Sequence, residues 1–169
     1  MIFKNEIWSI ITARKNSKSI KFKNLVPVNN KPLIQYSFDV LKNNKLISKN
    51  VISTDHSKII SISKKYNFEI IKRPRNLSGD LINSVDVVLH VLKKMHSKFK
   101  YLPKWFVLIQ PTSIFLQSSD LNKLIKKFSN SSANSAQTIV KVPHQFHAYN
   151  QRYFDGKYTE FIFANKRKK

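Results

Sequence analysis

The chain has 169 residues, no cysteine, and 31 Lys and Arg residues against 9 Asp and Glu residues, which gives a formal net charge of +22. A hydrophobic content of 41% lies within the globular range, so we expect a folded protein. The lack of cysteine excludes a disulfide framework, a thiolate metal site and a cysteine nucleophile. With no apolar run of membrane-spanning length, we expect a soluble, cytoplasmic protein made of a single domain, residues 1–169.

The high charge raises the alternative of a basic, non-enzymatic module that binds nucleic acid, because Lys and Arg gain by releasing counterions from a polyphosphate. The lysines, however, are scattered through every predicted element, and the one compact basic run lies at residues 166–169. Such a terminal run is typical of a solvated tail. We therefore attribute the charge to overall composition and expect no nucleic-acid partner.

The predicted elements alternate between strands and helices. In the first half we predict a strand at 7–13, a cationic loop at 12–24, an extended piece at 25–28, a turn at 29–30, a helix at 32–43, a strand at 51–53, a helix carrying Ile59, Ile60, Ile62 and Tyr66, and a strand at 69–71. In the second half we predict a helix from 83 or 84 to 94, a strand at 105–109, a helix at 119–128, a strand at 136–142, a loop at 143–149 and a hairpin turn at 155–156.

This alternation predicts an α/β fold with a mostly parallel, Rossmann-like sheet between helical layers. The most hydrophobic strand, 105–109, is expected at the sheet centre, and Val85, Val88, Leu89 and Leu92 are expected on the buried side of their helix. Asp55 could cap the helix that follows it.

Polar clusters follow the predicted strands, at 14–24, 54–55, 73–84 and 110–113. Since parallel strands end at one edge of a sheet, these clusters should converge on one crevice. Their side chains suit a nucleoside triphosphate, because Arg and Lys neutralise phosphate oxygens while Ser, amide and backbone N–H groups bond to them. The candidates are Arg14, Ser17, Lys18, Lys23, Arg73, Ser84 and Gln110. The loop is neither a P-loop nor a dinucleotide fingerprint, since both need glycines that it lacks.

Several blocks of this sequence, in order, resemble the acylneuraminate cytidylyltransferases, which make CMP-sialic acid and its legionaminic and pseudaminic relatives. The first block is Ile11-Thr12-Ala13-Arg14-Lys15-Asn16-Ser17-Lys18, followed by Lys23-Asn24-Leu25. The later blocks are Lys31-Pro32-Leu33-Ile34, Val51-Ile52-Ser53-Thr54-Asp55, Arg73-Pro74, Ser84-Val85-Asp86-Val87-Val88-Leu89-His90 and Leu108-Ile109-Gln110-Pro111-Thr112-Ser113. A Kdo cytidylyltransferase is related but has Lys-Pro where this chain has Lys23-Asn24.

The resemblance implies a fold of the nucleotide-diphospho-sugar transferase type and transfer of CMP from CTP to the anomeric hydroxyl of a nine-carbon acidic sugar. Pyrophosphate is released, and Mg²⁺ is expected as a cofactor. By the same resemblance, Arg14, Ser17, Lys18 and Lys23 match phosphate-loop positions, with Arg14 and Lys23 catalytic; Asn24, Arg73 and Ser84 match nucleoside positions; and Gln110 matches a sugar position. Residues 143–169 resemble the start of a dimer-forming, sugar-facing region, so a homodimer is implied.

The chain also departs from the family pattern. Ser19 replaces a usual glycine, Leu81-Ile82-Asn83 replaces Thr-Ala-Ser, and Ile114-Phe115-Leu116 replaces Pro-Leu-Arg. The family's metal-binding Asp-x-Asp pair would lie beyond Lys169, so no metal ligand is assigned. The alternatives therefore include an inactive or truncated remnant of the family, and the sequence does not identify the sugar.

Overall fold

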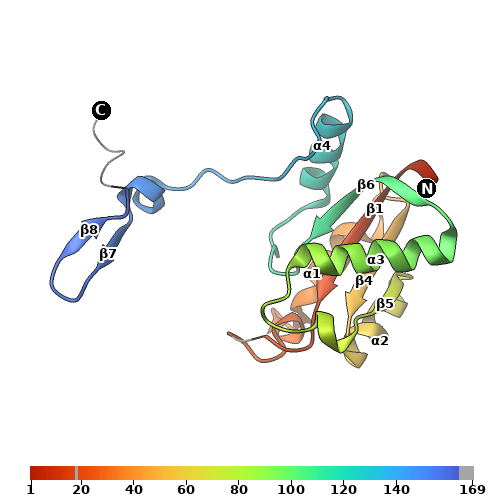
Figure 1. Ribbon diagram of the computed structural model, residues 1–169, viewed down its shortest axis with the longest axis horizontal. Coiled ribbons are helices and arrows are strands. Elements are labelled where there is room, and N and C mark those ends of the chain that lie inside the picture. The colour runs from red at the N-terminus through yellow and green to blue at the C-terminus, as the bar shows by residue number, and fades with distance from the viewer. Residues whose placement is uncertain (18, 164–169) are drawn as a thin grey trace. The chain divides into compact units, whose positions relative to one another are not determined.

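The computed structural model describes residues 1–17 and 19–163, which form two compact units (Figure 1). The larger unit is Met1–Ser132, and the smaller one begins at Ala133. Each unit is described by itself below. Every site residue that the sequence predicts belongs to the larger unit.

A four-stranded parallel sheet forms the centre of the larger unit, with strand order β5-β4-β1-β6. Ile11 of β1 pairs with Ile52 of β4 on one side and Ile109 of β6 on the other, so the apolar middle of β1 lies inside the sheet. The strands are β1 (Phe3–Ala13), β4 (Lys49–Thr54), β5 (Glu69–Lys72) and β6 (Leu102–Ile109).

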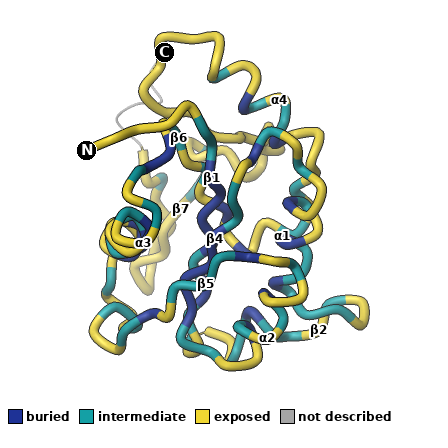
Figure 2. The backbone as a smooth tube through the Cα atoms, turned by 90° about the vertical axis from the view of Figure 1, so that its right-hand side faces the viewer, coloured by how far each residue is buried: buried dark blue, intermediate teal, exposed yellow. Residues whose placement is uncertain are grey.

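Helices cover both faces of this sheet (Figure 1). They are α1 (Leu33–Lys42), α2 (Ser57–Lys65), α3 (Ser84–Phe99) and α4 (Ser118–Ser129). Side chains of α1, α2 and α4 pack with Ile11 and Ile52 on one face, and those of α3 pack with Trp8 and Ile10 on the other. Successive residues of a strand point to opposite faces, so β1 supplies both cores. The predicted three-layer α/β fold is confirmed, and Figure 2 shows β1 and β4 as its buried centre.

A small hairpin between the cationic loop and α1 was only partly predicted. The expected extended piece is β2 (Pro27–Val28), which pairs antiparallel with β3 (Lys31–Pro32). The predicted turn joins them, with φ of 47° at Asn29 and 60° at Asn30. Asn tolerates this left-handed conformation better than most residues, so two consecutive Asn residues suit a tight hairpin.

Two predictions about the sheet and its covering helix are wrong. Strand β6 lies at an edge, and its Phe106 and Leu108 are partly exposed, because apolar content marks a strand without ranking its place in the sheet. Of the four side chains predicted on the buried side of α3, Val88 is buried and Leu92 packs partly buried against the core, but Val85 and Leu89 are exposed. The helix instead buries Val87, Val91 and Met95 beside Val88. The helix continues to Phe99, beyond the predicted end at 94, and the longer helix includes Met95 in its buried stripe.

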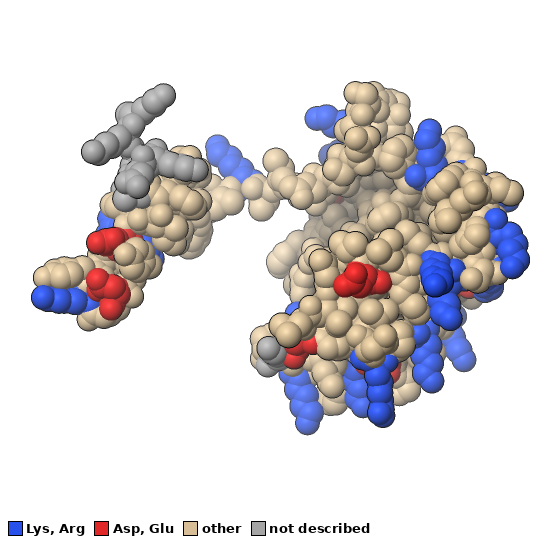
Figure 3. Space-filling model, viewed as in Figure 1, with Lys and Arg blue, Asp and Glu red and all other residues tan. Residues whose placement is uncertain are grey.

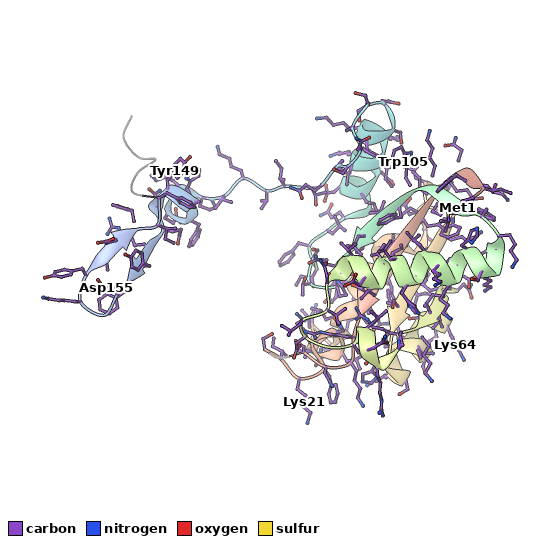
Figure 4. The ribbon with its side chains drawn as sticks, in the orientation of Figure 1. Met1, Lys21, Lys64, Trp105, Tyr149 and Asp155 are labelled. Carbon is purple, nitrogen blue, oxygen red and sulfur yellow. The ribbon has the colours of Figure 1, made fainter. Side chains whose placement is uncertain are left out.

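The smaller unit contains two short 3₁₀ helices, η3 (His144–Phe146) and η4 (Ala148–Asn150), and a hairpin of β7 (Arg152–Phe154) and β8 (Thr159–Phe161). The predicted turn at 155–156 joins the hairpin, and Figure 4 labels Asp155 there. The Asp155 carboxylate accepts hydrogen bonds from the backbone N–H groups of Lys157 and Tyr158, and Gly156 has a φ of 104°.

The strand predicted at 136–142 is not present. This segment is irregular, and its Ile139 and Val140 are more than four-fifths exposed. A strand requires a hydrogen-bonded neighbour, and none of the described strands pairs with it. Among the described residues, no helix combines the length and apolar character needed to cross a membrane.

Candidate functional site

The site lies at the carboxyl ends of β1 and β6, where the order of the strands reverses. From β1 the chain builds outward to β4 and then β5, and it returns through α3 to place β6 on the other side of β1. Loops leaving neighbouring strands in opposite directions open a crevice at such a point, which is where open α/β sheets bind ligands.

A cleft of about 250 Å³ occupies this place. All predicted site residues that the structure describes line it: Arg14, Ser17, Lys23, Asn24, Arg73, Ser84 and Gln110. Lys18 lies outside the described residues. Thr12, Asp80 and Thr112 also line the cleft. Asp80 and Thr112 belong to the polar clusters predicted to converge there, but no role was assigned to either; Thr12, at the end of β1, was not predicted as a site residue.

The cationic loop after β1 is held at both ends by hydrogen bonds. The Asn24 side-chain amide donates to the backbone carbonyl of Arg14 (3.1 Å), and the backbone N–H of Lys15 donates to the Asp55 carboxylate (2.5 Å). Phe22 has a left-handed φ of 52° and packs its ring edge-to-face against His56. These contacts fix the backbone on which Arg14 and Lys23 stand, so both side chains line the cleft from a defined position.

Asn24 therefore has a structural role in addition to any contact with a ligand. It is 8% exposed, in a short 3₁₀ helix, η1 (Lys23–Leu25), and its amide closes the loop on Arg14. Figure 4 labels Lys21, which is exposed on the same loop and does not line the cleft. The loop thus carries cations of two kinds, some facing the cleft and some facing solvent.

Arg73 is the deepest cation of the cleft, at 8% exposed. Its backbone N–H donates to the Thr54 carbonyl at the end of β4 (2.9 Å), which places the residue beside the sheet edge. Burial lowers the pKa of its guanidinium, the charge of Arg14 lowers it further, and Asp55 opposes both. Its buried Nε has no hydrogen-bond partner among residues 1–17 and 19–163. Since an unsatisfied buried donor is costly, this guanidinium is suited to an anionic ligand.

Ser84 is the first residue of α3, and the preceding Asn83 caps the helix. The Asn83 side-chain oxygen accepts a hydrogen bond from the N–H of Val85 (3.0 Å). The predicted cap at 83 or 84 is therefore Asn83, which leaves the exposed Ser84 hydroxyl available to the cleft.

Gln110 follows β6 directly, is exposed and lines the cleft. In the sheet, β6 lies on one side of β1, and β4 and β5 lie on the other. The Gln110 backbone carbonyl accepts a hydrogen bond from Ser113 (3.0 Å), which turns the chain after the strand. The side-chain amide can both donate and accept, as recognition of a hydroxylated ligand requires.

Asp55 does not cap helix α2 as suggested by the sequence. His56 does so, because its Nδ1 accepts a hydrogen bond from the N–H of Lys58 (3.1 Å). The Asp55 carboxylate instead accepts a hydrogen bond from the backbone N–H of Lys15, and its negative charge favours the charged form of Arg73. Its position directly after β4 was a signal that it belongs to the site edge, but its partner lies 40 residues away in sequence.

On the face of the larger unit shown in Figure 3, Lys and Arg side chains are spread over the surface and Asp and Glu side chains are sparse. The cleft has a similar balance: Arg14, Lys23 and Arg73 line it, and among the described residues Asp80 is the one acid in its lining. Among residues 1–17 and 19–163, no group of three or more His, Cys, Asp or Glu side chains could hold a metal ion. The arrangement therefore suits a ligand with several negative charges.

Comparisons with known proteins agree with this chemistry. The family model described as cytidylyltransferase matches residues 8–153. The N-acylneuraminate cytidylyltransferase of Escherichia coli is 27% identical over 139 residues, 82% of this chain and 32% of the relative. The CMP-N,N'-diacetyllegionaminic acid synthase of Campylobacter jejuni is 36% identical over 96 residues, 56% of this chain and 41% of the relative.

Solved structures share the fold. A CMP:2-keto-3-deoxy-manno-octonic acid synthetase complexed with CTP superposes with a TM-score of 0.60 at 18% identity, covering 76% of this chain and 49% of the other. The chain spans only 32% and 58% of the lengths of the first two curated relatives that it matches.

Proposed function

This chain belongs to the cytidylyltransferase family, and from that premise we propose that it binds CTP and transfers CMP to the anomeric hydroxyl of a sialic-acid-like nonulosonic acid, releasing pyrophosphate. The observation that carries the proposal is the convergence of Arg14, Lys23 and Arg73 with polar side chains on one cleft at the switch point of the sheet. The names of the curated relatives support a nonulosonic acid as the acceptor.

In this reaction the sugar hydroxyl loses its proton to solvent and forms a new O–P bond to the α-phosphate, while the bond from the α-phosphorus to the bridging oxygen breaks. The leaving pyrophosphate carries the negative charge that builds up. Arg14 and Lys23 would neutralise that charge, and since both stand on a loop fixed by Asn24 and Asp55 they need little reorganisation to do so.

Arg73, Asn24 and Ser84 would hold the nucleoside part, and Gln110 would contact the sugar. Burial of Arg73 strengthens its interaction with an anionic or polar group, because the surroundings screen the charge less than water does. A cleft of about 250 Å³ is smaller than most small-molecule sites, which span roughly 300 to 1,000 Å³, so it would enclose part of a nucleotide rather than all of it.

Magnesium is expected for a nucleotidyl transfer because it neutralises phosphate charge. The described residues do not fit a magnesium site of their own, since the single carboxylate of the cleft, Asp80, is in an ion pair with Arg14. The charge neutralisation argued here therefore rests on the cations of the chain. A cytoplasmic location, a homodimer and a single domain over the whole chain remain predictions.

Isothermal titration of the chain with CTP tests the proposal. Arg14→Ala and Lys23→Ala should each weaken CTP binding by at least about tenfold, as expected for loss of a charged phosphate contact. Lys21→Ala is the matched control, because it removes the same charge from the same loop outside the cleft lining, and it should change the affinity little.

Two results would contradict the proposal: no binding at millimolar CTP, or equal affinities for the three variants. Steeply salt-dependent binding to DNA or RNA without preference for CTP over ATP would instead favour the nucleic-acid module. Pyrophosphate release, measured with CTP and a panel of nonulosonic acids, then tests turnover and identifies the sugar.

A further inference from the structure

The ion pair inside the cleft points to a role for Asp80 that the family assignment does not contain. Arg14 Nη1 lies 2.5 Å from Asp80 Oδ1, and both residues line the cleft. Asp80 is the one acid in a lining that also holds Lys23 and Arg73. Its carboxylate therefore forms an ion pair with a guanidinium that would otherwise be available to the ligand.

The two partners come from separate segments. Arg14 follows β1, and its backbone is held by Asn24 on one side and, through Lys15, by Asp55 on the other. Asp80 lies in the turn between η2 (Arg75–Leu77) and α3, where the neighbouring Leu81 is 96% exposed. Arg14 is thus fixed at its backbone, whereas the segment around Asp80 has little packing to hold it in place.

The pair is also exposed enough to be exchanged. The side chains of Arg14 and Asp80 are 28% and 35% exposed, and pairs that reach solvent contribute little to stability. A triphosphate offers several negative charges and can bind a guanidinium through two oxygens at once. Arg14 should therefore bind a phosphate in preference to Asp80 when a nucleotide enters.

We propose that Asp80 is an internal competitor for nucleotide phosphate: its carboxylate holds Arg14 in the empty cleft, and the incoming triphosphate displaces it. The proposal rests on the proposed function for the identity of the ligand. Asp80 thereby lowers the affinity of the cleft for any polyphosphate and keeps the Arg14 guanidinium paired between turnovers.

The test is titration of the wild type and Asp80→Asn with inorganic tripolyphosphate and with CTP, each in EDTA and again with Mg²⁺. Asp80→Asn should bind tripolyphosphate about 3- to 10-fold more tightly, since it removes one competing charge without changing the shape of the side chain. Asp80→Glu, which keeps the charge, should bind like the wild type. The gain should shrink as salt is added, because the pair is partly exposed.

Asp86→Asn is the matched control, because Asp86 carries the same charge nearby, is exposed on the first turn of α3 and does not line the cleft. It should not reproduce the gain. In an Arg14→Ala background Asp80→Asn should have no further effect, since the pair no longer exists. Circular dichroism of each variant establishes that it is folded.

Unchanged or weaker binding of tripolyphosphate by Asp80→Asn in EDTA would overturn the proposal. Weaker binding only in the presence of Mg²⁺ would also overturn it, by making Asp80 a metal ligand instead. Failure of the proposed function would look different. If the chain binds tripolyphosphate but not CTP, the proposal of CTP-dependent transfer fails. The competition between Asp80 and phosphate is then still decided by the tripolyphosphate affinity of Asp80→Asn.

Discussion

Replacing Arg73 by methionine should stabilise the empty protein and at the same time weaken its ligand binding. Arg73 is 8% exposed, and its Nε has no hydrogen-bond partner. Burial lowers the pKa of the guanidinium, which means that the folded protein disfavours its charged form. Methionine has a similar length, carries no charge and adapts its shape to the space available.

The magnitude follows from two opposing effects. Removing a buried, incompletely bonded cation gains about 1 to 3 kcal/mol, and losing its attraction to Asp55 returns part of that gain. Asp55 keeps its hydrogen bond from the backbone N–H of Lys15, so losing Arg73 should cost the Asp55 carboxylate little free energy. We expect a net stabilisation of about 1 to 2 kcal/mol, which corresponds to a rise of roughly 4 to 8 °C in Tm for a unit of this size.

Thermal unfolding followed by circular dichroism, with and without CTP, measures both effects. Without CTP, Arg73→Met should melt at a higher temperature than the wild type; with CTP the order should reverse, because truncating a buried charge contact weakens binding by at least about 30-fold. Arg75→Met is the matched control, since Arg75, two residues further along the chain at the start of η2, is exposed and should change neither value appreciably. A lower Tm for Arg73→Met without ligand would refute the reasoning, because it would mean that the guanidinium is already well satisfied.

Three further predictions concern stability. Burial, and next the charge of Lys15, lower the pKa of His56, so the unfolded state binds more protons than the folded state just below pH 6.5. The free energy of unfolding should therefore fall as the pH drops through that region. His56→Asn keeps a capping oxygen and should flatten the dependence of stability on pH. Phe38→Ala should cost about 3 to 5 kcal/mol in urea unfolding because Phe38 is fully buried, whereas Phe115→Ala, at an 88% exposed position, should stay within about 0.5 kcal/mol; equal losses would contradict the assignment of the core. Asp55→Ala should lose about 1 to 3 kcal/mol, and Asp55→Asn less, because the amide oxygen can still accept the hydrogen bond from Lys15; equal losses would mean that the charge facing Arg73 dominates.

The sequence was most informative where a local pattern has one structural solution. The strand at the start, the turn at Asn29 and Asn30 and the turn at 155–156 are each specified by adjacent residues, and the structure contains all three. The polar clusters after the strands were also informative, because parallel strands must end at the same edge.

It was less informative where the outcome depends on distant partners. Composition does not determine which segments pair in the sheet. The edge position of β6 and the irregular conformation of 136–142 both depend on that pairing. Helix α3 offers two overlapping apolar stripes that share Val88, and only the packing against β1 selects the one with Val91 and Met95. The cluster at 54–55 was predicted at the same crevice, but the specific partners of Asp55 were not, since its hydrogen bond with Lys15 joins segments 40 residues apart.

The two acids beside the cleft explain how a site so rich in cations can remain folded without its ligand. Asp55 is half-buried, binds a backbone N–H of the cationic loop and offsets the charge of the deepest cation, so it should keep its place whether or not an anion is bound. Asp80 is partly exposed, lies in a loosely packed turn and pairs with the outer cation, so it can leave when an anion arrives. A permanent counter-charge suits the buried arginine because an unpaired buried charge would destabilise the fold, and an exchangeable one suits the role we propose for Arg14, in which phosphate replaces Asp80. Under the proposed function, the inner cation would be held by the fold and the outer cation would be available to the ligand.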